Sequence, residues 1–337
     1  SSSNDTGKGV AVDSSSNIYV TGTTTGGLDG YTNSGEQDIF LVKYSSSGSK
    51  LWTKQLGTYT SDIAHGVVVY GSSTYVTGET RGGLDNNTNS GNKDIFLVKY
   101  NSNGVRVWTK QLGTTSEDVG YGVAVDDSSE NIYVTGTTFG ALTGSNIGSS
   151  DIFLVKYNAA GIRQWTRQLG TTSEDVAYGI TVDSNDNSTE NIYLTGYTKG
   201  NLNSESNSGN SDVFLANYYD NGTNNGALQW VKLLGSSSAE VGRSVSINTS
   251  NYIYLTGDNG TTDGDYDAFL VKYNSNGNII WSTEISSSSA EHGYGVVTYS
   301  NTFTYALGNT GGELDNNTNS GLQDVFIFKY ADNGTKQ

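Results

Sequence analysis

The sequence DIFLVKY, residues 38–44, decides the fold of this chain because it returns at regular intervals. It recurs unchanged at residues 94–100 and 151–157, and in altered form as DVFLANY (212–218), DAFLVKY (267–273) and DVFIFKY (324–330). The intervals between the leading aspartates are 56, 57, 61, 55 and 57 residues. A period of this length, kept along the whole chain, indicates a repeat architecture.

Each repeat contains four short segments with the composition of β-strands. In the first repeat they are GVAVD (9–13), NIYVTG (17–22), DIFLVKY and KLWTKQLG (50–57), joined by turns rich in Gly, Ser and Asn. β-Branched and aromatic residues dominate these segments, and no helical period extends over them. We therefore predict an all-β fold in which each repeat forms one four-stranded antiparallel sheet.

A four-stranded sheet repeated in this way predicts a β-propeller, with one sheet per blade and the first strand nearest the axis. We expect a single propeller domain over residues 1–337, built from six repeats of about 56 residues. The blades span approximately residues 1–57, 58–113, 114–170, 171–235, 236–285 and 286–337. Because the sixth repeat stops at Gln337, before its tryptophan segment, the last blade is expected to be one strand short in this chain. The alternative is that residues beyond these ends supply the outer strand.

Composition narrows the range of partners. The formal net charge of −16 argues against nucleic acid, because binding to phosphates needs clustered Lys and Arg. No apolar run approaches 18 residues, so we expect no membrane insertion. There is no Cys, which excludes thiolate metal sites and a cysteine nucleophile. Glycans, basic or surface proteins and cations remain as partners.

Catalytic motifs are absent. The chain has two histidines, His65 and His292, in repeats that are not adjacent, so a histidine triad cannot be assembled. Paired carboxylates such as Glu117 and Asp118 recur at the same place in other repeats, which favours a structural role, because one active site needs asymmetry. We expect that the protein is not an enzyme.

Two loops have the oxygen-ligand spacing that calcium sites use. GLDNNTNSGNKD (83–94) and GELDNNTNSGLQD (312–324) place Asp and Asn side chains at alternate positions around a glycine. The candidate calcium ligands are Asp85, Asn87, Asn89, Asp94, Asp315, Asn317, Asn319 and Asp324. The alternative is a metal-free loop in which Asn and Asp are chosen for turn formation and the last Asp binds backbone N–H groups. No other cofactor is predicted.

A variable position close to the first strand of each repeat predicts a ligand surface. An acidic residue is kept in all six repeats, and three positions later the residue changes from repeat to repeat. We place this position just before the strand nearest the axis, at one mouth of the central channel. The predicted ligand-binding residues are Lys8, His65, Tyr121, Tyr178, Arg243 and Tyr294. Tyr rings stack on sugars and Arg or Lys holds anions, but side chains that only fill the channel would give the same pattern.

The repeat as a whole resembles a known family. GVAVD, NIYVTG and DIFLVKY, in this order, are similar to the SBBP-type β-propeller repeat of bacterial and archaeal surface or secreted proteins. The resemblance covers essentially the whole chain, and it implies a propeller at the cell surface or outside the cell without established catalytic residues. Two departures are Asn217, where other copies have Lys, and Ser244, where others have Gly. The family name implies seven blades, whereas six repeats are counted in this chain.

These observations lead to three hypotheses of function. The first is a non-catalytic extracellular or cell-surface binding or adhesion propeller, with a glycan or surface protein at one mouth of the channel. The second is a structural subunit of a surface layer or filament, which self-associates through the open edge of the last blade. The third is an enzyme that acts on polysaccharide.

Overall fold

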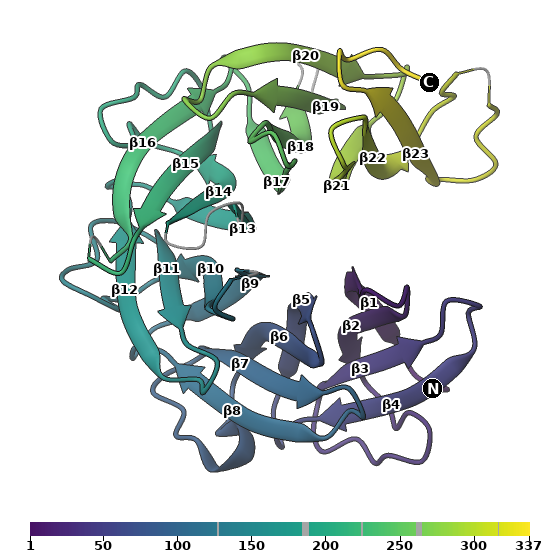
Figure 1. Ribbon diagram of the computed structural model, residues 1–337, viewed down its shortest axis with the longest axis vertical. Coiled ribbons are helices and arrows are strands. Elements are labelled where there is room, and N and C mark those ends of the chain that lie inside the picture. The colour runs from purple at the N-terminus through teal and green to yellow at the C-terminus, as the bar shows by residue number, and fades with distance from the viewer. Residues whose placement is uncertain (127, 184–188, 224, 261–264, 316) are drawn as a thin grey trace. The chain divides into compact units, whose positions relative to one another are not determined.

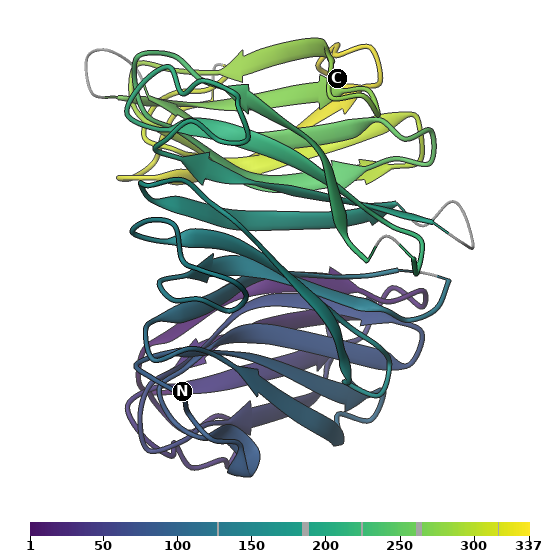
Figure 2. The same cartoon turned by 90° about the vertical axis from the view of Figure 1, so that its left-hand side faces the viewer.

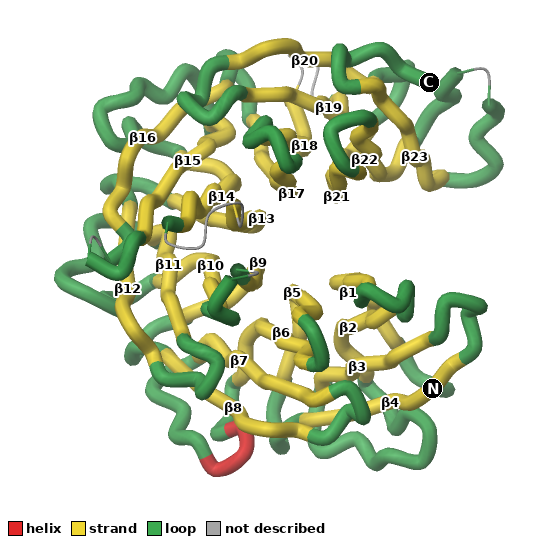
Figure 3. The backbone as a smooth tube through the Cα atoms, in the orientation of Figure 1, coloured by secondary structure: helices red, strands yellow, loops and turns green. Residues whose placement is uncertain are grey.

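The chain folds as a six-bladed β-propeller, as the repeat predicts. The computed structural model describes residues 1–126, 128–183, 189–223, 225–260, 265–315 and 317–337. These residues contain 23 strands and one single-turn 3-10 helix, η1, which Figure 3 draws in red. The strands gather into two compact units, residues 1–169 and 170–337, and each unit is described by itself.

The first unit holds blades 1 to 3, each a four-stranded antiparallel sheet in chain order (Figure 1). Blade 1 comprises β1 (Asp5–Val12), β2 (Ile18–Thr24), β3 (Asp38–Tyr44) and β4 (Lys50–Leu56). Blade 2 comprises β5 (Asp62–Tyr70), β6 (Ser73–Thr80), β7 (Asp94–Asn101) and β8 (Arg106–Leu112), with η1 (Leu84–Asn86) between β6 and β7. Blade 3 comprises β9 (Asp118–Val125), β10 (Ile132–Thr138), β11 (Asp151–Tyr157) and β12 (Arg163–Leu169).

The second unit holds blades 4 to 6. Blade 4 comprises β13 (Asp175–Asp183), β14 (Glu190–Thr198), β15 (Asp212–Asp220) and β16 (Ala227–Leu234). Blade 5 comprises β17 (Glu240–Ile247), β18 (Ile253–Gly260), β19 (Tyr266–Tyr273) and β20 (Ile279–Ile285). Blade 6 has the three strands β21 (Glu291–Tyr299), β22 (Phe303–Thr310) and β23 (Asp324–Ala331), so the expectation that it is one strand short is confirmed.

Within each unit the first strands of neighbouring blades lie side by side. β1 contacts β5 and β5 contacts β9, while β13 contacts β17 and β17 contacts β21. The first strand is therefore the inner strand of its blade, and the tryptophan strand is the outer one. The sheets twist strongly from the inner to the outer strand, as the side view in Figure 2 shows.

The core lies between the blades, which explains why DIFLVKY is apolar at consecutive positions. Ile39 and Leu41 point to one face of blade 1 and belong to a buried cluster with Val76 and Phe96 of blade 2. Phe40 and Val42 lie on the opposite face and are also buried. A sheet covered on both faces needs apolar residues throughout, because period-2 side chains alternate between the faces. In the described part of the chain, no helix is long and apolar enough to cross a membrane.

Candidate functional site

All six predicted ligand-binding residues occupy one structural position, the extra residue of a β-bulge in the inner strand. In blade 1 the pairing passes from Gly7 opposite Gly22 to Gly9 opposite Thr21, so Lys8 has no partner in the ladder. The register shifts in the same way in the other five blades, at His65, Tyr121, Tyr178, Arg243 and Tyr294. Bulges redirect a side chain out of the regular pleat and are frequent beside binding sites.

The inner strands begin earlier than predicted, and this changes the setting of these residues. The sequence suggests that they precede the strand, but β1 already begins at Asp5 and contains Lys8. The same holds for the other blades, where the strand begins at the acidic residue. The expectation that the variable residue lies in the loop before the strand is therefore wrong, because the bulge lets the ladder continue past it.

The glycine of the second strand makes room for the bulge. A Cβ atom on Gly78 would lie 1.9 Å from the carbonyl oxygen of Ile63, which the bulge pushes toward the second strand. Equivalent approaches of 1.8 to 2.0 Å occur at Gly22, Gly136, Gly196, Gly257 and Gly308. This close backbone contact explains why every repeat has Gly at the end of its NIYVTG segment.

In the first unit the bulge residues include a neutral histidine. The rings of His65 and Tyr121 lie 5.0 Å apart at an angle of 58°. Burial, together with the charges of Lys8 and Lys93, lowers the pKa of His65 to about 4. Its Nε2 atom is buried and has no hydrogen-bond partner among the described residues. At neutral pH the pair is thus an uncharged imidazole against a phenol ring.

In the second unit an arginine lies between two tyrosines. The guanidinium of Arg243 is 5.4 Å from the ring centre of Tyr178 and 5.9 Å from that of Tyr294. Its Nε and Nη2 atoms donate to one carboxylate oxygen of Asp258, at 3.0 and 2.7 Å. Asp258 is buried, and His292 Nδ1 lies 3.4 Å from its other oxygen. The carboxylate therefore neutralises much of the charge of Arg243 and holds its plane between the rings.

Sequence reasoning missed Asp258 and gave His292 no role at the site. Asp258 follows the glycine of the second strand, where other repeats have Thr23, Glu79, Thr137, Tyr197 and Asn309. This position varies as the bulge position does, and that variation is the signal that points to it. His292, which lies beside Asp258 but belongs to blade 6, stands where the other repeats have Thr or an aliphatic residue.

The kept acidic residue closes the turn between blades. Asp62 accepts hydrogen bonds from the backbone N–H and the hydroxyl of Thr58, at 2.5 and 2.9 Å, and one from the hydroxyl of Thr80. Burial raises the pKa of Asp62 despite these bonds. Asp118 makes the same set of bonds, with Thr114 and Thr138, and Glu240 and Glu291 bond the equivalent serines Ser236 and Ser287. Satisfied carboxylates of this kind hold the fold and are not exposed to a ligand.

The side chains of the first candidate calcium loop already have local partners. Asp85 pairs with Arg106 at 2.6 Å, and the side-chain oxygen of Asn89 accepts the N–H of Gly91. Asn87 donates to the carbonyl of Leu84, and Asp94 accepts the N–H of Ser90. In the second loop Asp315 pairs with Lys336, Asn317 and Asn319 donate to Leu314 and Thr310, and Asp324 accepts the N–H of Ser320.

A second observation bears on the same loops. Among the described residues, no group of three or more His, Asp or Glu side chains is placed to hold a metal ion. A calcium ion at either loop would have to compete with the ion pair at Asp85 or Asp315. Calcium binding and the metal-free loop both stay predictions, and the local partners favour the metal-free loop.

Comparison with known proteins relates the chain to repeat proteins. Residues 1–29, 107–141 and 164–203 match the family model of the SBBP β-propeller repeat. The chain is 27% identical over 269 residues to the uncharacterized WD repeat-containing protein L264 of Acanthamoeba polyphaga mimivirus, covering 60% of this chain and 19% of that protein. It is 25% identical over 276 residues to the regulatory protein FlaEY of Caulobacter vibrioides, covering 72% and 28%. The chain thus spans less than a third of the length of either relative.

Two solved structures from bat isolates are similar to the chain in arrangement. One is a subtype N11 neuraminidase-like protein from a flat-faced bat isolate, with a TM-score of 0.48, 11% identity, and coverage of 97% of this chain and 87% of that chain. The other is a subtype N10 neuraminidase-like protein from a little yellow-shouldered bat isolate, with a TM-score of 0.49, 12% identity, and coverage of 97% and 92%.

Proposed function

We propose that this protein is a non-catalytic binding propeller that acts outside the cell or at the cell surface. Its ligand, a glycan or a surface protein, binds to the bulge residues of the inner strands. The observation that carries this proposal is the bulge that all six blades share. The backbone geometry is the same at the six positions, whereas the side chain or the residues around it differ from blade to blade. A common backbone with variable side chains is how repeat proteins build a binding surface.

The bulge residues of the second unit give the more specific indication of a ligand. Tyr178 and Tyr294 flank the guanidinium of Arg243, whose charge is balanced by Asp258. A balanced guanidinium keeps unused N–H donors but has lost most of its attraction for an anion. Tyr rings stack on the apolar faces of sugar rings, and the remaining donors suit sugar hydroxyls. We therefore favour a neutral saccharide at Tyr178, Arg243 and Tyr294 over an acidic one.

The proposal that the surface is not catalytic follows from the state of its titratable groups. A general base is most effective when its pKa lies near the working pH, and His65 has a pKa of about 4. Asp258 is bound to Arg243, and Glu240 and Glu291 close turns. Release of products from neutral or acidic polysaccharides by the purified protein would instead establish the enzymatic alternative.

A glycan array followed by titration of the best ligand tests the proposal. We expect Tyr178→Ala and Tyr294→Ala each to weaken binding by roughly tenfold or more, because each removes a stacking face. Tyr299→Ala is the matched control, since Tyr299 is exposed and lies at the other end of the same strand, β21, as Tyr294. The combined variant Tyr121→Ala, Tyr178→Ala, Arg243→Ala extends the test to both units. Undiminished binding by correctly folded variants would place the site elsewhere.

A structural role in a surface layer or filament is the second candidate, because the second unit by itself leaves an apolar face of blade 6 without a neighbouring blade. Val325 and Ile327 are 78% and 68% exposed, whereas Ile39 and Leu41 at the same repeat positions in blade 1 are 1% exposed. Leu322, in the loop before β23, is 94% exposed. On this hypothesis a second copy of the chain covers the face. The self-association predicted from the sequence uses a different contact, the open outer edge of blade 6.

Light scattering and electron microscopy of the purified protein test this second role. We expect assemblies larger than a monomer that the double variant Val325→Thr, Ile327→Thr dissociates. Val107→Thr, on an exposed position of an outer strand, is the control that should leave the assembly intact. A wild-type protein that stays monomeric at high micromolar concentration would contradict the structural role.

A further inference from the structure

Where two neighbouring blades pack together, here called a joint, a leucine can fill an apolar cavity, here called the leucine slot. At three joints this leucine comes from the loop between the second and third strands of a blade. Leu84 is completely buried in the cluster between blades 1 and 2. Leu142 packs into the cluster between blades 2 and 3, and Leu314 into that between blades 5 and 6. The backbone N–H groups of Leu84 and Leu142 donate to the side-chain oxygens of Gln111 and Gln168, each at 3.1 Å. The slot therefore holds a leucine by its apolar walls and by one side-chain oxygen, which accepts the backbone N–H of the leucine.

Blade 5 does not provide this leucine. Thr80 and Asp94 pair across β6 and β7 and are 14 positions apart, whereas their equivalents Asn259 and Asp267 are only eight apart. No leucine occurs between positions 259 and 267. Ser282 of β20 is exposed, although its equivalent Thr109 in blade 2 is buried.

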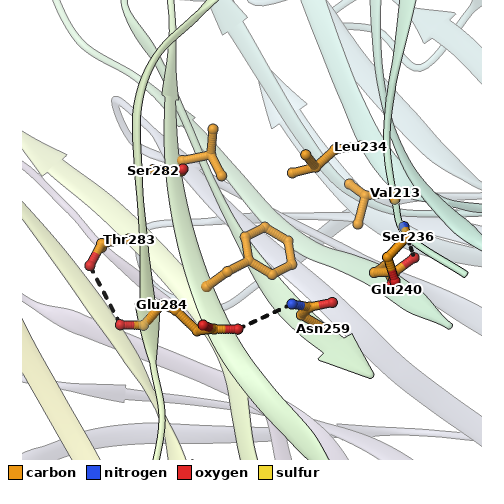
Figure 4. A pocket seen from close by; sticks show the side chains of 11 residues that line it. Val213, Leu234, Ser236, Glu240, Asn259, Ser282, Thr283 and Glu284 are labelled. Carbon is orange, nitrogen blue, oxygen red and sulfur yellow. Dashed lines mark hydrogen bonds between the residues drawn. The ribbon is translucent and has the colours of Figure 1, made fainter. Parts of the chain in front are cut away.

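The slot between blades 4 and 5 forms a pocket with a volume of about 430 Å³ (Figure 4). Its apolar walls are Val213 and Leu234 from blade 4, and Phe269 and Val271 from blade 5. In the joint between blades 2 and 3 the same positions carry Ile95, Leu112, Phe153 and Val155, which belong to the cluster that holds Leu142. The walls for a leucine are thus present at the joint that lacks one.

The rim of this slot is acidic where the others are neutral. Glu284 stands at the position of Gln111 and Gln168, and its Oε1 accepts a hydrogen bond from Asn259 at 3.2 Å. Figure 4 shows Glu284 among the residues that line the pocket, beside Asn259. Unlike glutamine, a carboxylate only accepts hydrogen bonds and attracts cations. The rim therefore favours a ligand that combines an N–H donor with positive charge.

We propose that this leucine slot binds a peptide segment of another protein, with a leucine side chain in the pocket and a basic residue beside it. The peptide's leucine N–H donates to Glu284, as the N–H of Leu84 donates to Gln111. The basic residue lies beside the exposed carboxylate of Glu284. This site lies at the outer part of the joint, and it is independent of the bulge surface assigned above.

Fluorescence anisotropy with a defined peptide tests the proposal. The probe is a labelled peptide with the sequence of residues 81–87, RGGLDNN, in which lysine replaces the aspartate. We expect saturable binding with one site per chain. A control peptide with alanine in place of leucine should bind roughly tenfold more weakly or worse, because it cannot fill the apolar walls. Equal binding of the two peptides would overturn the proposal.

Variants of the intact chain locate the peptide. Ser282→Trp fills the slot from an exposed position, so we expect it to abolish binding while the melting temperature stays unchanged. Glu284→Gln keeps the acceptor but removes the charge, and it should weaken binding and reduce its dependence on salt. Glu313→Gln removes an exposed carboxylate that does not line the pocket, so it is the charge control and should change neither property. Unchanged binding by Ser282→Trp, or full binding by Glu284→Gln at all salt concentrations, would contradict the assignment.

Discussion

The indole Nε1 of Trp108 donates a hydrogen bond to the carbonyl oxygen of Ala159 at 3.3 Å. This bond joins the outer strand of blade 2 to the turn between β11 and β12 of blade 3. Trp52 bonds Ser102 and Trp281 bonds Asp332 in the same way, so the contact repeats in both units. These three pairs of neighbouring blades are therefore joined at their outer edge by the same contact.

Replacing Trp108 by alanine tests this fastening. We expect the free energy of unfolding of the first unit to fall by about 3–5 kcal/mol, because the indole packs on Tyr75 and on the turn of blade 3. Denaturant titration followed by circular dichroism measures the change. Val107→Ala, at a largely exposed position of the same strand, should cost much less. Equal effects of the two substitutions would show that the tryptophan does not join the blades.

Substitution of Gly161 tests how the indole of Trp108 packs on the turn between β11 and β12. Its φ of +73° is left-handed, and a Cβ atom there would lie 3.0 Å from Cε2 of the indole. Gly48 occupies the same turn in blade 1 with a φ of +81° and nothing within 4 Å of its Cβ position. We expect Gly48→Ala to cost about 1–2 kcal/mol from the backbone alone. Gly161→Ala should cost more, because it adds the clash, and a melting-temperature comparison of the two variants would detect the difference.

Asp267 makes stability depend on pH in the weakly acidic range. Burial, together with the charges of Glu284 and Glu291, raises the pKa of Asp267 to about 6 from its ordinary 3.8. Folding therefore takes up a proton between these values, and stability falls as the pH rises through this window. We expect Asp267→Asn to be more stable than wild type above pH 6 and to lose this advantage near pH 4. Parallel pH profiles of melting temperature for the two proteins would refute this.

His65 changes the stability in the opposite direction, so that stability falls as the pH falls. Its pKa is about 4 in the folded chain and 6.5 in an ordinary environment, so folding releases a proton between these values. The contribution of the neutral form is complete above pH 6.5 and is lost as the pH falls toward 4. We expect His65→Gln to narrow the gap between melting temperatures measured at pH 7.5 and pH 4.5. If the gap is unchanged, His65 titrates as an exposed histidine does.

Calcium binding is tested by titrating chelated protein. We expect no saturable heat and no shift in melting temperature, because the loop side chains already have partners such as Arg106 for Asp85 and Lys336 for Asp315. Asp85→Ala should then change stability by less than about 1 kcal/mol, as for an exposed ion pair. A saturable rise in melting temperature that Asp85→Ala abolishes would establish the metal site instead.

The sequence predicted the strands well because their pattern is repeated. DIFLVKY is β3, KLWTKQLG contains β4 to within one residue, and the short last blade was expected from the position of Gln337. The start of the inner strand was predicted too late, at Gly9 instead of Asp5. A bulge adds one residue to one strand only, and it therefore breaks the alternation by which strands are recognised.

The sequence predicted only part of the candidate site. Variation among repeats identified Arg243 and Tyr178, but not that Asp258 would neutralise the arginine. The pocket beside Glu284 was also not predicted from the sequence. A deletion in the sequence does not say which cavity it leaves, because the cavity is bounded by residues of two blades.

The sequence by itself thus determined the number of repeats, the strand order and the alternation of buried faces, because these are local patterns of chain composition. The tertiary structure decided which side chains are charged, which are paired, and which slot lacks a leucine. His65 is neutral because it is buried beside Lys8 and Lys93, and Arg243 is neutralised because a second strand brings Asp258 to it. Such states depend on distances between residues far apart in sequence, and only packing of the blades fixes those distances.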